Sequence, residues 1–180
     1  MNLKELTAEN HRSAERKRFA KVLMSGSIDP ALYYKYLTNQ FYCYTMLESK
    51  LPLVFLGVED IRRANLMRDD LQELESTYGF VYSGALITRS TQEYITYCED
   101  TKNSLIPHMY VRHFGDMYGG AMIASRIPGS GKMYEFKDKE LLKTKVRALL
   151  DDSMADEANK CFAFAIQLFT ELDNYIEPQL

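Results

Sequence analysis

Apolar residues recur at helical spacing along almost the whole chain of 180 residues, and no stretch alternates convincingly between apolar and polar residues. The pattern predicts an all-helical fold without a sheet. Pro30 directly after Asp29 is typical of a helix start, Gly79 of a helix end, and Ser90 with Glu93 of a capping box. We expect helices over residues 3–24, 30 to about 52, 59–78, 90–105, 108–127, 138–152 and 154–176.

Length and composition predict one soluble domain over residues 1–180. A net charge of −3 argues against a nucleic-acid binder, and 13 tyrosines with no tryptophan suit a pocket that needs apolar walls and hydroxyl groups. We expect neither a signal peptide nor a membrane anchor, because no long apolar run occurs and residues 177–180 are polar. Cys43, Cys98 and Cys161 form no paired pattern, which favours a reducing, cytoplasmic compartment.

Positive charge gathers in residues 11–21, which hold five Lys and Arg residues. This segment is either a solvated helix face or a docking surface for an acidic partner, where complementary charge speeds encounter. The sequence leaves both interpretations open.

Residues 110–120 contain three glycines within six positions, and each glycine inside a helix costs up to about 1 kcal/mol relative to alanine. Gly115 and Gly119 share one helix face and leave the backbone bare there. Either another helix packs closely on that face, or a flat ligand lies on it. Asp116, with Arg112 one turn earlier, favours the ligand because the pair could hold ordered water, although a surface ion pair would look the same.

A second candidate site lies near the N-terminus, where Lys4, His11 and Glu15 share one side of the first expected helix. A lone histidine is more often structural or merely exposed. Neutral imidazole is nevertheless a good axial haem ligand, and its other ring nitrogen commonly finds an acceptor, here Glu15. Lys4 could reach a propionate.

These segments resemble parts of haem oxygenases. Residues 3–15 are similar to the family's proximal helix, residues 110–120 to its distal-helix signature of an arginine, a Gly-Asp pair and a Gly-Gly pair, and residues 162–169 to its last core helix. The three matches stand in family order from one end of the chain to the other. The resemblance therefore implies a single-domain helical fold with haem b between a proximal and a kinked distal helix.

The activity implied by the resemblance is cleavage of haem at a meso carbon with O2, giving biliverdin, carbon monoxide and ferrous iron. Haem would be both substrate and cofactor. The family pattern favours the IXα isomer of biliverdin. Soluble members usually take electrons from ferredoxin, which the basic segment would face, and a bilin reductase is a further candidate partner.

Individual residues acquire roles through the resemblance. His11 is expected to ligate the iron, with Glu15 holding its far nitrogen. Gly115 and Gly119 would let the distal helix lie over the haem, and Asp116 would organise the water that supplies a proton. The remaining matches are propionate-binding positions (Lys4, Tyr110, Lys143 and Arg147), the distal network (Tyr44 and Arg112) and the pocket (Gly120, Phe162 and Phe169), the two phenylalanines being equally explained as core aromatics.

Four features depart from the family pattern. Val111 and Ala165 stand where relatives often carry polar residues, which implies a thinner water network. His113 replaces a common tyrosine, and we interpret it as structural because a second histidine on iron would block the oxygen site. Tyr118 is bulkier than the usual residue, and the stretch 147–157 is shorter than in most members.

Three other interpretations remain open: a haem carrier or sensor without turnover, another chemistry on the same fold, and a non-catalytic interaction domain. A di-iron site would need Glu-x-x-His motifs, which occur nowhere in the chain. The cysteines show no partner for a thiaminase-like hydrolase. An interaction domain would not explain the glycine run beside Asp116.

Overall fold

The computed structural model describes residues 2–176, and every regular element among them is helical, which confirms the predicted fold class. The polar end at 177–180 lies outside the described residues. The α-helices are α1 (Leu3–Leu6), α2 (Ala8–Glu15), α3 (Arg18–Ser25), α4 (Pro30–Lys50), α5 (Ala64–Tyr78), α6 (Arg89–Asp100), α7 (Ile106–Met109), α8 (Gly115–Ile123), α9 (Lys139–Arg147) and α10 (Ala155–Asp173). Shorter elements are the 3-10 turns η1 (Glu59–Ile61), η2 (Gly84–Leu86), η4 (Lys132–Tyr134) and η5 (Asp152–Met154), and the π-helical turn η3 (Tyr110–Phe114).

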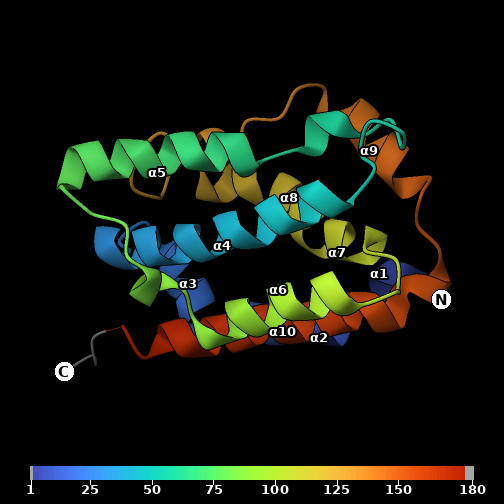
Figure 1. Ribbon diagram of the computed structural model, residues 1–180, viewed down its shortest axis with the longest axis horizontal. Helices are drawn as coiled ribbons and strands as arrows, with labels where there is room; N and C mark the ends of the chain where they lie inside the picture. Colours follow the sequence, from blue (N-terminus) through green and yellow to red (C-terminus); the bar gives the residue numbers. More distant parts are fainter. Residues whose placement is uncertain (1, 177–180) are drawn as a thin grey trace.

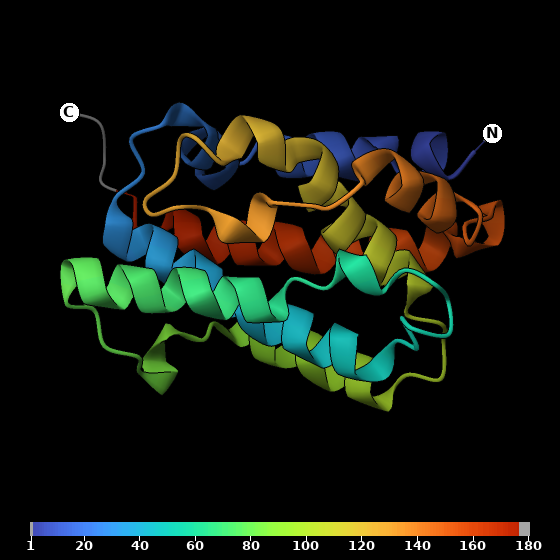
Figure 2. The same ribbon diagram turned by 90° about the horizontal axis from the view of Figure 1, so that it is seen from above.

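Helix α4 crosses the middle of the molecule, with α5 on one side and α6 on the other (Figure 1). Helix α10 contacts α2, α3, α6 and α7, and therefore joins the first and last parts of the chain. Seen from above, α1 to α3 and α8 lie on the same side of α10 (Figure 2). This arrangement brings the two candidate segments, more than ninety residues apart in the chain, to one side of the molecule.

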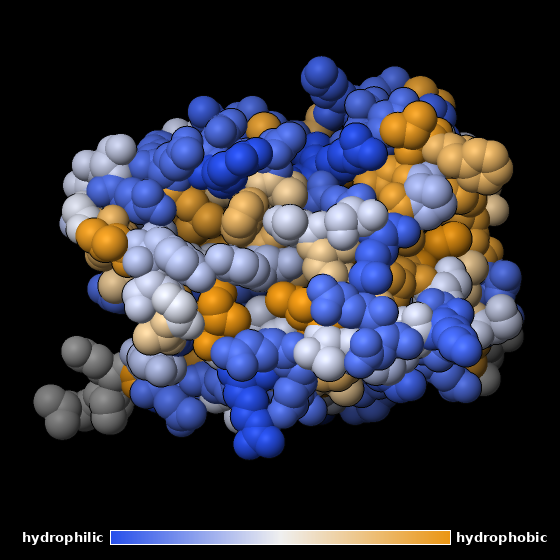
Figure 3. Space-filling model, viewed as in Figure 1, coloured by the Kyte–Doolittle hydropathy of each residue, from blue (hydrophilic) through white to orange (hydrophobic). Residues whose placement is uncertain are grey.

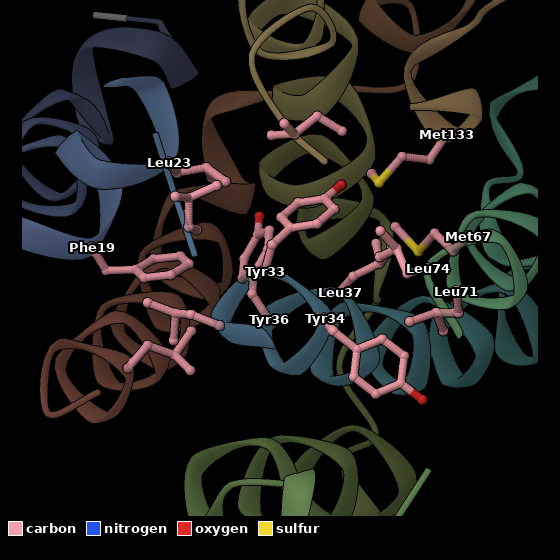
Figure 4. Packing of buried hydrophobic residues seen from close by; sticks show 14 of the residues in the cluster. Phe19, Leu23, Tyr33, Tyr34, Tyr36, Leu37, Met67, Leu71, Leu74 and Met133 are labelled. Carbon is pink, nitrogen blue, oxygen red and sulfur yellow. The ribbon is translucent and has the colours of Figure 1, made fainter. Parts of the chain in front are cut away.

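Two clusters of buried apolar side chains hold these helices together. In the first, Phe19 and Leu23 of α3 and Met67 of α5 pack around Tyr33 and Tyr36 of α4 (Figure 4). The second cluster joins the C-terminal half of α4 to α6, α7, η3, α9 and α10 and includes Met109, Phe114 and Cys161. Removal of this apolar surface from water is the main force that fixes the helices in place.

Several expected helix ends are confirmed. The Asp29 side chain accepts a hydrogen bond of 3.1 Å from the backbone N–H of Leu32, with Pro30 at the first helical position. Gly79 ends α5 in the left-handed conformation, with φ of +75°. The expected helices at 138–152 and 154–176 are shorter than predicted, since α9 ends at Arg147 and α10 at Asp173.

The first expected helix, 3–24, is divided into α1, α2 and α3. The Thr7 hydroxyl donates 2.9 Å to the carbonyl of Leu3, a local bond that competes with regular helix geometry. Lys17 is extended, with ψ of 142°, and separates α2 from α3. Lys4 and His11 therefore belong to different helices.

Two other boundaries differ because tertiary contacts supply the caps. The backbone N–H groups of Arg63 and Ala64 donate to the carboxylate of Glu48 on α4, so α5 begins at Ala64 rather than at residue 59. Thr88, not Ser90, caps α6, because its side chain accepts from the Thr91 backbone. This helix ends at residue 100 instead of 105.

The expected capping box at α6 does not form. Ser90 lies inside the helix, where its backbone N–H and hydroxyl both donate to Glu171 on α10. Glu93 instead forms an ion pair of 2.8 Å with Arg89. A distant carboxylate therefore takes the place that the sequence pattern assigned to Glu93.

Hydrophilic side chains cover much of the face shown in Figure 3, with apolar patches between them. In the loop after α4, Val54 is 66% exposed and Phe55 is 89% exposed. Among the other large apolar residues that the structure describes, only Val81 is comparably exposed. None of the helices over residues 2–176 is long and apolar enough to cross a bilayer.

Candidate active site

His11 and Glu15 lie on the exposed side of α2. The imidazole Nε2 is 3.3 Å from a Glu15 carboxylate oxygen, a distance that follows from the helical spacing of four residues. Both side chains are more than half exposed. The His11 ring lies 5.8 Å, centroid to centroid, from Phe162 of α10. The structure therefore brings together three of the expected haem contacts and leaves the imidazole accessible.

The expected distal helix is not one regular helix. It consists of α7, the π-helical turn η3 and α8, and η3 ends directly before Gly115. A π-helical turn uses i→i+5 hydrogen bonds and changes the direction of the helix, as such turns commonly do at functional sites. The expected kink therefore has a structural cause that precedes the glycines.

The three glycines of this segment have different surroundings. A Cβ built on Gly115 or Gly119 meets no heavy atom within 4 Å, so close helix packing does not explain either residue. A Cβ on Gly120 would overlap the ring of Tyr134. The bare backbone for a flat ligand is formed by Gly115 and Gly119, whereas the structure places Gly120 in a packing contact.

Asp116 is held from α4. The Tyr44 hydroxyl donates a hydrogen bond to the Asp116 carboxylate, joining residues that are 72 positions apart. Burial raises the pKa of Asp116 to about 6, although the Tyr44 hydrogen bond and the charges of Arg112 and Arg63 oppose this rise. The carboxyl group can therefore hold or release a proton near neutral pH.

Arg112 is buried and is held by residues of α4 and α6. Its Nη1 donates 3.0 Å to the side-chain oxygen of Gln40, and its guanidinium lies 4.2 Å from the centre of the Tyr94 ring. Arg112 and Asp116 do not form the expected i, i+4 ion pair, since Asp116 accepts its hydrogen bond from Tyr44 of α4. The charge of Arg112 nevertheless lowers the pKa of Asp116.

Other buried tyrosines, from α4 and η4, are affected by the charge of Asp116. Burial, followed by the charge of Asp116, raises the pKa of Tyr36. The hydroxyls of Tyr33 and Tyr134 are buried as well. Burial is the main cause that raises the pKa of both groups, and the charge of Asp116 contributes less. Of these residues only Tyr44 was expected at the site, and the high tyrosine content was the one sequence signal for the others.

A second polar network, which the sequence did not reveal, lies beyond Arg112. The buried His108 ring binds Tyr94 through Nδ1, at 2.8 Å, and Glu157 through Nε2, at 2.9 Å. Burial alone would lower the pKa of His108, but contacts with Cys161 and Glu157 raise it overall. Both ring nitrogens of His108 are therefore occupied inside the protein.

His113 is also buried. Its ring lies 4.2 Å from that of Tyr44, and its Nε2 is 3.7 Å from Glu48. Burial lowers the pKa of His113, although the Glu48 carboxylate opposes this shift. This placement supports the structural interpretation of His113. Of the three histidines, only His11 is exposed.

Two of the expected propionate-binding residues, Lys143 and Arg147, lie on α9. The Lys143 ammonium is 3.1 Å from Glu140, and both Lys143 and Arg147 contact Tyr118 of α8. Lys4, a further expected propionate-binding residue, is exposed on α1, far in sequence from Lys143 and Arg147. The ring of Phe169 packs 5.5 Å from Phe19 in the first apolar cluster, the position of a core aromatic.

Tyr110, Val111 and Ala165 are neither fully buried nor fully exposed. Tyr110 is half-buried, with its ring 5.8 Å from Phe114. Val111 and Ala165 are partly buried as well.

Comparison with known proteins agrees with the resemblance. A family model described as heme oxygenase matches residues 1–171. The heme oxygenase of Rhodella violacea is 26% identical, over 98% of this chain and 88% of the relative. That of Pyropia yezoensis is 28% identical, over 96% and 84%, and heme oxygenase 2 of mouse is 26% identical, over 95% and 64%.

Solved structures share the fold. Heme oxygenase-1 from the cyanobacterium Synechocystis, in complex with heme, superposes with a TM-score of 0.79 at 24% identity, covering 96% of this chain and 91% of that one. The heme oxygenase of Leptospira interrogans gives 0.77 at 26% identity, covering 94% and 97%. With the family model matched over nearly the whole chain, this protein belongs to the haem oxygenase family, whose members bind haem and degrade it.

Proposed function

We propose that this enzyme opens the haem ring at a meso carbon with O2 and releases biliverdin IXα, carbon monoxide and ferrous iron. The observation that carries the proposal is the bare backbone at Gly115 and Gly119 directly beside Asp116, whose pKa is raised to about 6. A flat ligand on this backbone would lie next to a group that can exchange a proton near neutral pH.

The residues present fit a haem group. A Cβ at Gly115 or Gly119 would project into space where no protein atom lies within 4 Å. The absence of side chains at these two positions therefore leaves room for a flat group against the backbone. The exposed imidazole of His11 would hold the iron, and the adjacent Phe162 would supply an apolar wall. When bound, haem supplies the iron that activates O2 and the ring that is opened.

Each group of residues has a separate task in this proposal. His11 binds the iron, and Glu15 orients the imidazole through its ring nitrogen. Lys143 and Arg147, one turn apart on α9, bind propionate carboxylates. Asp116 holds the proton that the reaction requires.

Tyr44 and the buried surroundings determine the orientation and the protonation of Asp116. The Tyr44 hydroxyl donates to Asp116, which fixes the carboxylate orientation, while burial keeps its protonated form populated near pH 6. Arg112 opposes this through its charge and is itself anchored on Gln40. The protein thus positions a weak acid at the edge of the bare backbone.

We further propose that ferredoxin donates the electrons and docks on the basic surface of α2 and α3. Arg12 and Arg16 each lie near Glu9, at 3.0 and 3.9 Å, so their charge is partly offset. Charge reversal at Lys17 and Lys21 preserves these pairs. The double variant should slow turnover with ferredoxin and spare turnover with ascorbate, and an equal loss with both reductants would exclude docking at this surface.

The proposed compartment is the cytosol, because all three cysteines are buried as free thiols. A bilin reductase that accepts the product is a further proposed partner.

The test of the main proposal is an optical titration with hemin, followed in the same cuvette by ferredoxin, its reductase, NADPH and air. A saturable Soret band that decays while biliverdin accumulates, identified by chromatography, is the expected result. A Soret band that survives these conditions would instead indicate a haem carrier or sensor. Failure to form a saturable Soret band would contradict both.

A further inference from the structure

Tyr118 joins the glycine-bearing helix to the two cations of α9. Its hydroxyl accepts a hydrogen bond from Nη2 of Arg147. The Lys143 ammonium lies 4.4 Å from the centre of the Tyr118 ring, and the Arg147 guanidinium lies 5.7 Å from it. One aromatic ring on α8 therefore contacts both of the cations that we propose to bind the propionates, Lys143 and Arg147.

The Tyr118 ring is itself held in place. Phe114, one turn earlier, meets it edge-on at a centroid distance of 4.6 Å, and the Arg147 guanidinium lies 5.9 Å from the Phe114 ring. The side chain of Lys143 is only 17% exposed, although that of its ion-pair partner Glu140 is 86% exposed. A cation on an aromatic face gains electrostatic energy from the ring, so this cluster restricts two otherwise flexible side chains.

The position of Tyr118 in the helix matters for the site. It directly precedes Gly119 and follows Gly115 by three residues, so it stands at the border of the bare backbone. Its side chain is 44% exposed, which places the cation cluster at the rim rather than in the core. A guanidinium has five N–H donors, so Arg147 can keep the Tyr118 bond and still bind a carboxylate.

We infer that Tyr118 is a positioning residue that orients Lys143 and Arg147 toward the carboxylates of the bound substrate. The inference rests on the proposed function and deepens it, because it identifies which residue prepares the propionate-binding cations. Its role is exerted through the two cations, so it depends on the presence of free carboxylates on the ligand.

The test compares hemin with hemin dimethyl ester, in which both propionates are esterified, as ligands of the full chain. Loss of the Tyr118 hydroxyl in Tyr118→Phe should raise the dissociation constant for hemin about 3- to 10-fold, the range that one hydrogen bond accounts for. Tyr118→Ser, which also removes the ring, should raise it further. Binding of the ester should not change in either variant.

The matched control is Tyr82→Phe, which removes the hydroxyl of a similarly exposed tyrosine, at 49%, in the loop between α5 and α6. It should leave binding of both ligands unchanged. Thermal unfolding of each variant without ligand checks that the fold is intact. In an Arg147→Gln background, Tyr118→Phe should have no further effect on the hemin dissociation constant if its hydroxyl acts through Arg147.

Three results would overturn the inference while leaving the proposed function in place: unchanged hemin affinity in both Tyr118 variants, an equal loss for hemin and its ester, or tighter binding of hemin by Tyr118→Phe. An equal loss would show that Tyr118 supports the haem face itself, and tighter binding would show that it competes with the carboxylates. Failure of the parent protein to bind hemin would overturn the proposed function, and this inference with it.

Discussion

His11 and Glu15 stand one turn apart on a single exposed helix, whereas Asp116 on α8 is bound by a tyrosine 72 positions away on α4. The first pair depends on helical spacing alone. The second depends on how α4, α8 and η3 pack, and burial changes the acidity of its carboxyl group. The two sides of the site therefore differ in what a substitution will disturb.

On the exposed side, His11 and Glu15 contact each other across one helical turn, so a substitution there has a local effect. On the buried side, Tyr44, Arg112 and Asp116 share contacts and charges, so a change in one alters the others.

The largest effect is expected for His11→Ala. Removal of the proposed iron ligand should abolish turnover and change the ferric spectrum, and added imidazole should restore both, because the exposed site gives a free ligand access. Absorption spectra and biliverdin yield would measure this. An unchanged spectrum would mean that His108 or His113 binds the iron, although both are fully buried.

Asp116→Asn should leave hemin binding intact and slow biliverdin formation about 10²- to 10⁴-fold, the usual contribution of a positioned acid or base. Asparagine preserves the size of the side chain and removes the titratable proton. The hemin dissociation constant and the turnover rate should be measured on the same preparation. Normal biliverdin output would assign proton delivery to another group.

Gly119→Ala and Gly120→Ala should have opposite effects on stability. The first places a methyl group where no protein atom lies within 4 Å, and should raise the free energy of unfolding by up to about 1 kcal/mol while weakening hemin binding. The second overlaps Tyr134 and should lower the free energy of unfolding by about 1–3 kcal/mol. Urea unfolding would distinguish them, and equal effects would contradict the assignment of the bare face to Gly119.

The smallest effect is a pH dependence of stability. The pKa of Asp116 is raised to about 6 in the folded protein, above its ordinary value of 3.8, so the folded state binds more protons between these values. Lowering the pH from 7 to 5 should therefore stabilise the parent relative to Asp116→Asn by about 1 kcal/mol. Parallel pH profiles for the two proteins would show that Asp116 is not held in a raised-pKa environment.

Much of the fold could be predicted from local patterns. Asp29 with Pro30 and Gly79 marked true helix ends, because each acts on its own neighbouring backbone. The capping box at Ser90 failed because Glu171, on a distant helix, binds Ser90 instead. The start of α5 was misplaced for the same reason, since its cap comes from Glu48 on α4.

The candidate site shows the same difference between features set by local spacing and features set by contacts with distant helices. The pairing of His11 with Glu15 and the shared face of Gly115 and Gly119 follow from helical periodicity. The expected pair of Arg112 with Asp116 does not form. Arg112 donates to Gln40 instead, and Asp116 accepts from Tyr44. Local spacing cannot reveal these partners, because packing brings them in from another helix.

By itself, the sequence determined the helical class and the family, because these depend on periodicity and on residue order along the chain. Only the tertiary structure decided that Gly120 packs on Tyr134, that Tyr118 joins Lys143 and Arg147, and that Asp116 has a raised pKa. These properties arise from burial and from contacts between helices. Both are set by the way in which distant parts of the chain pack together.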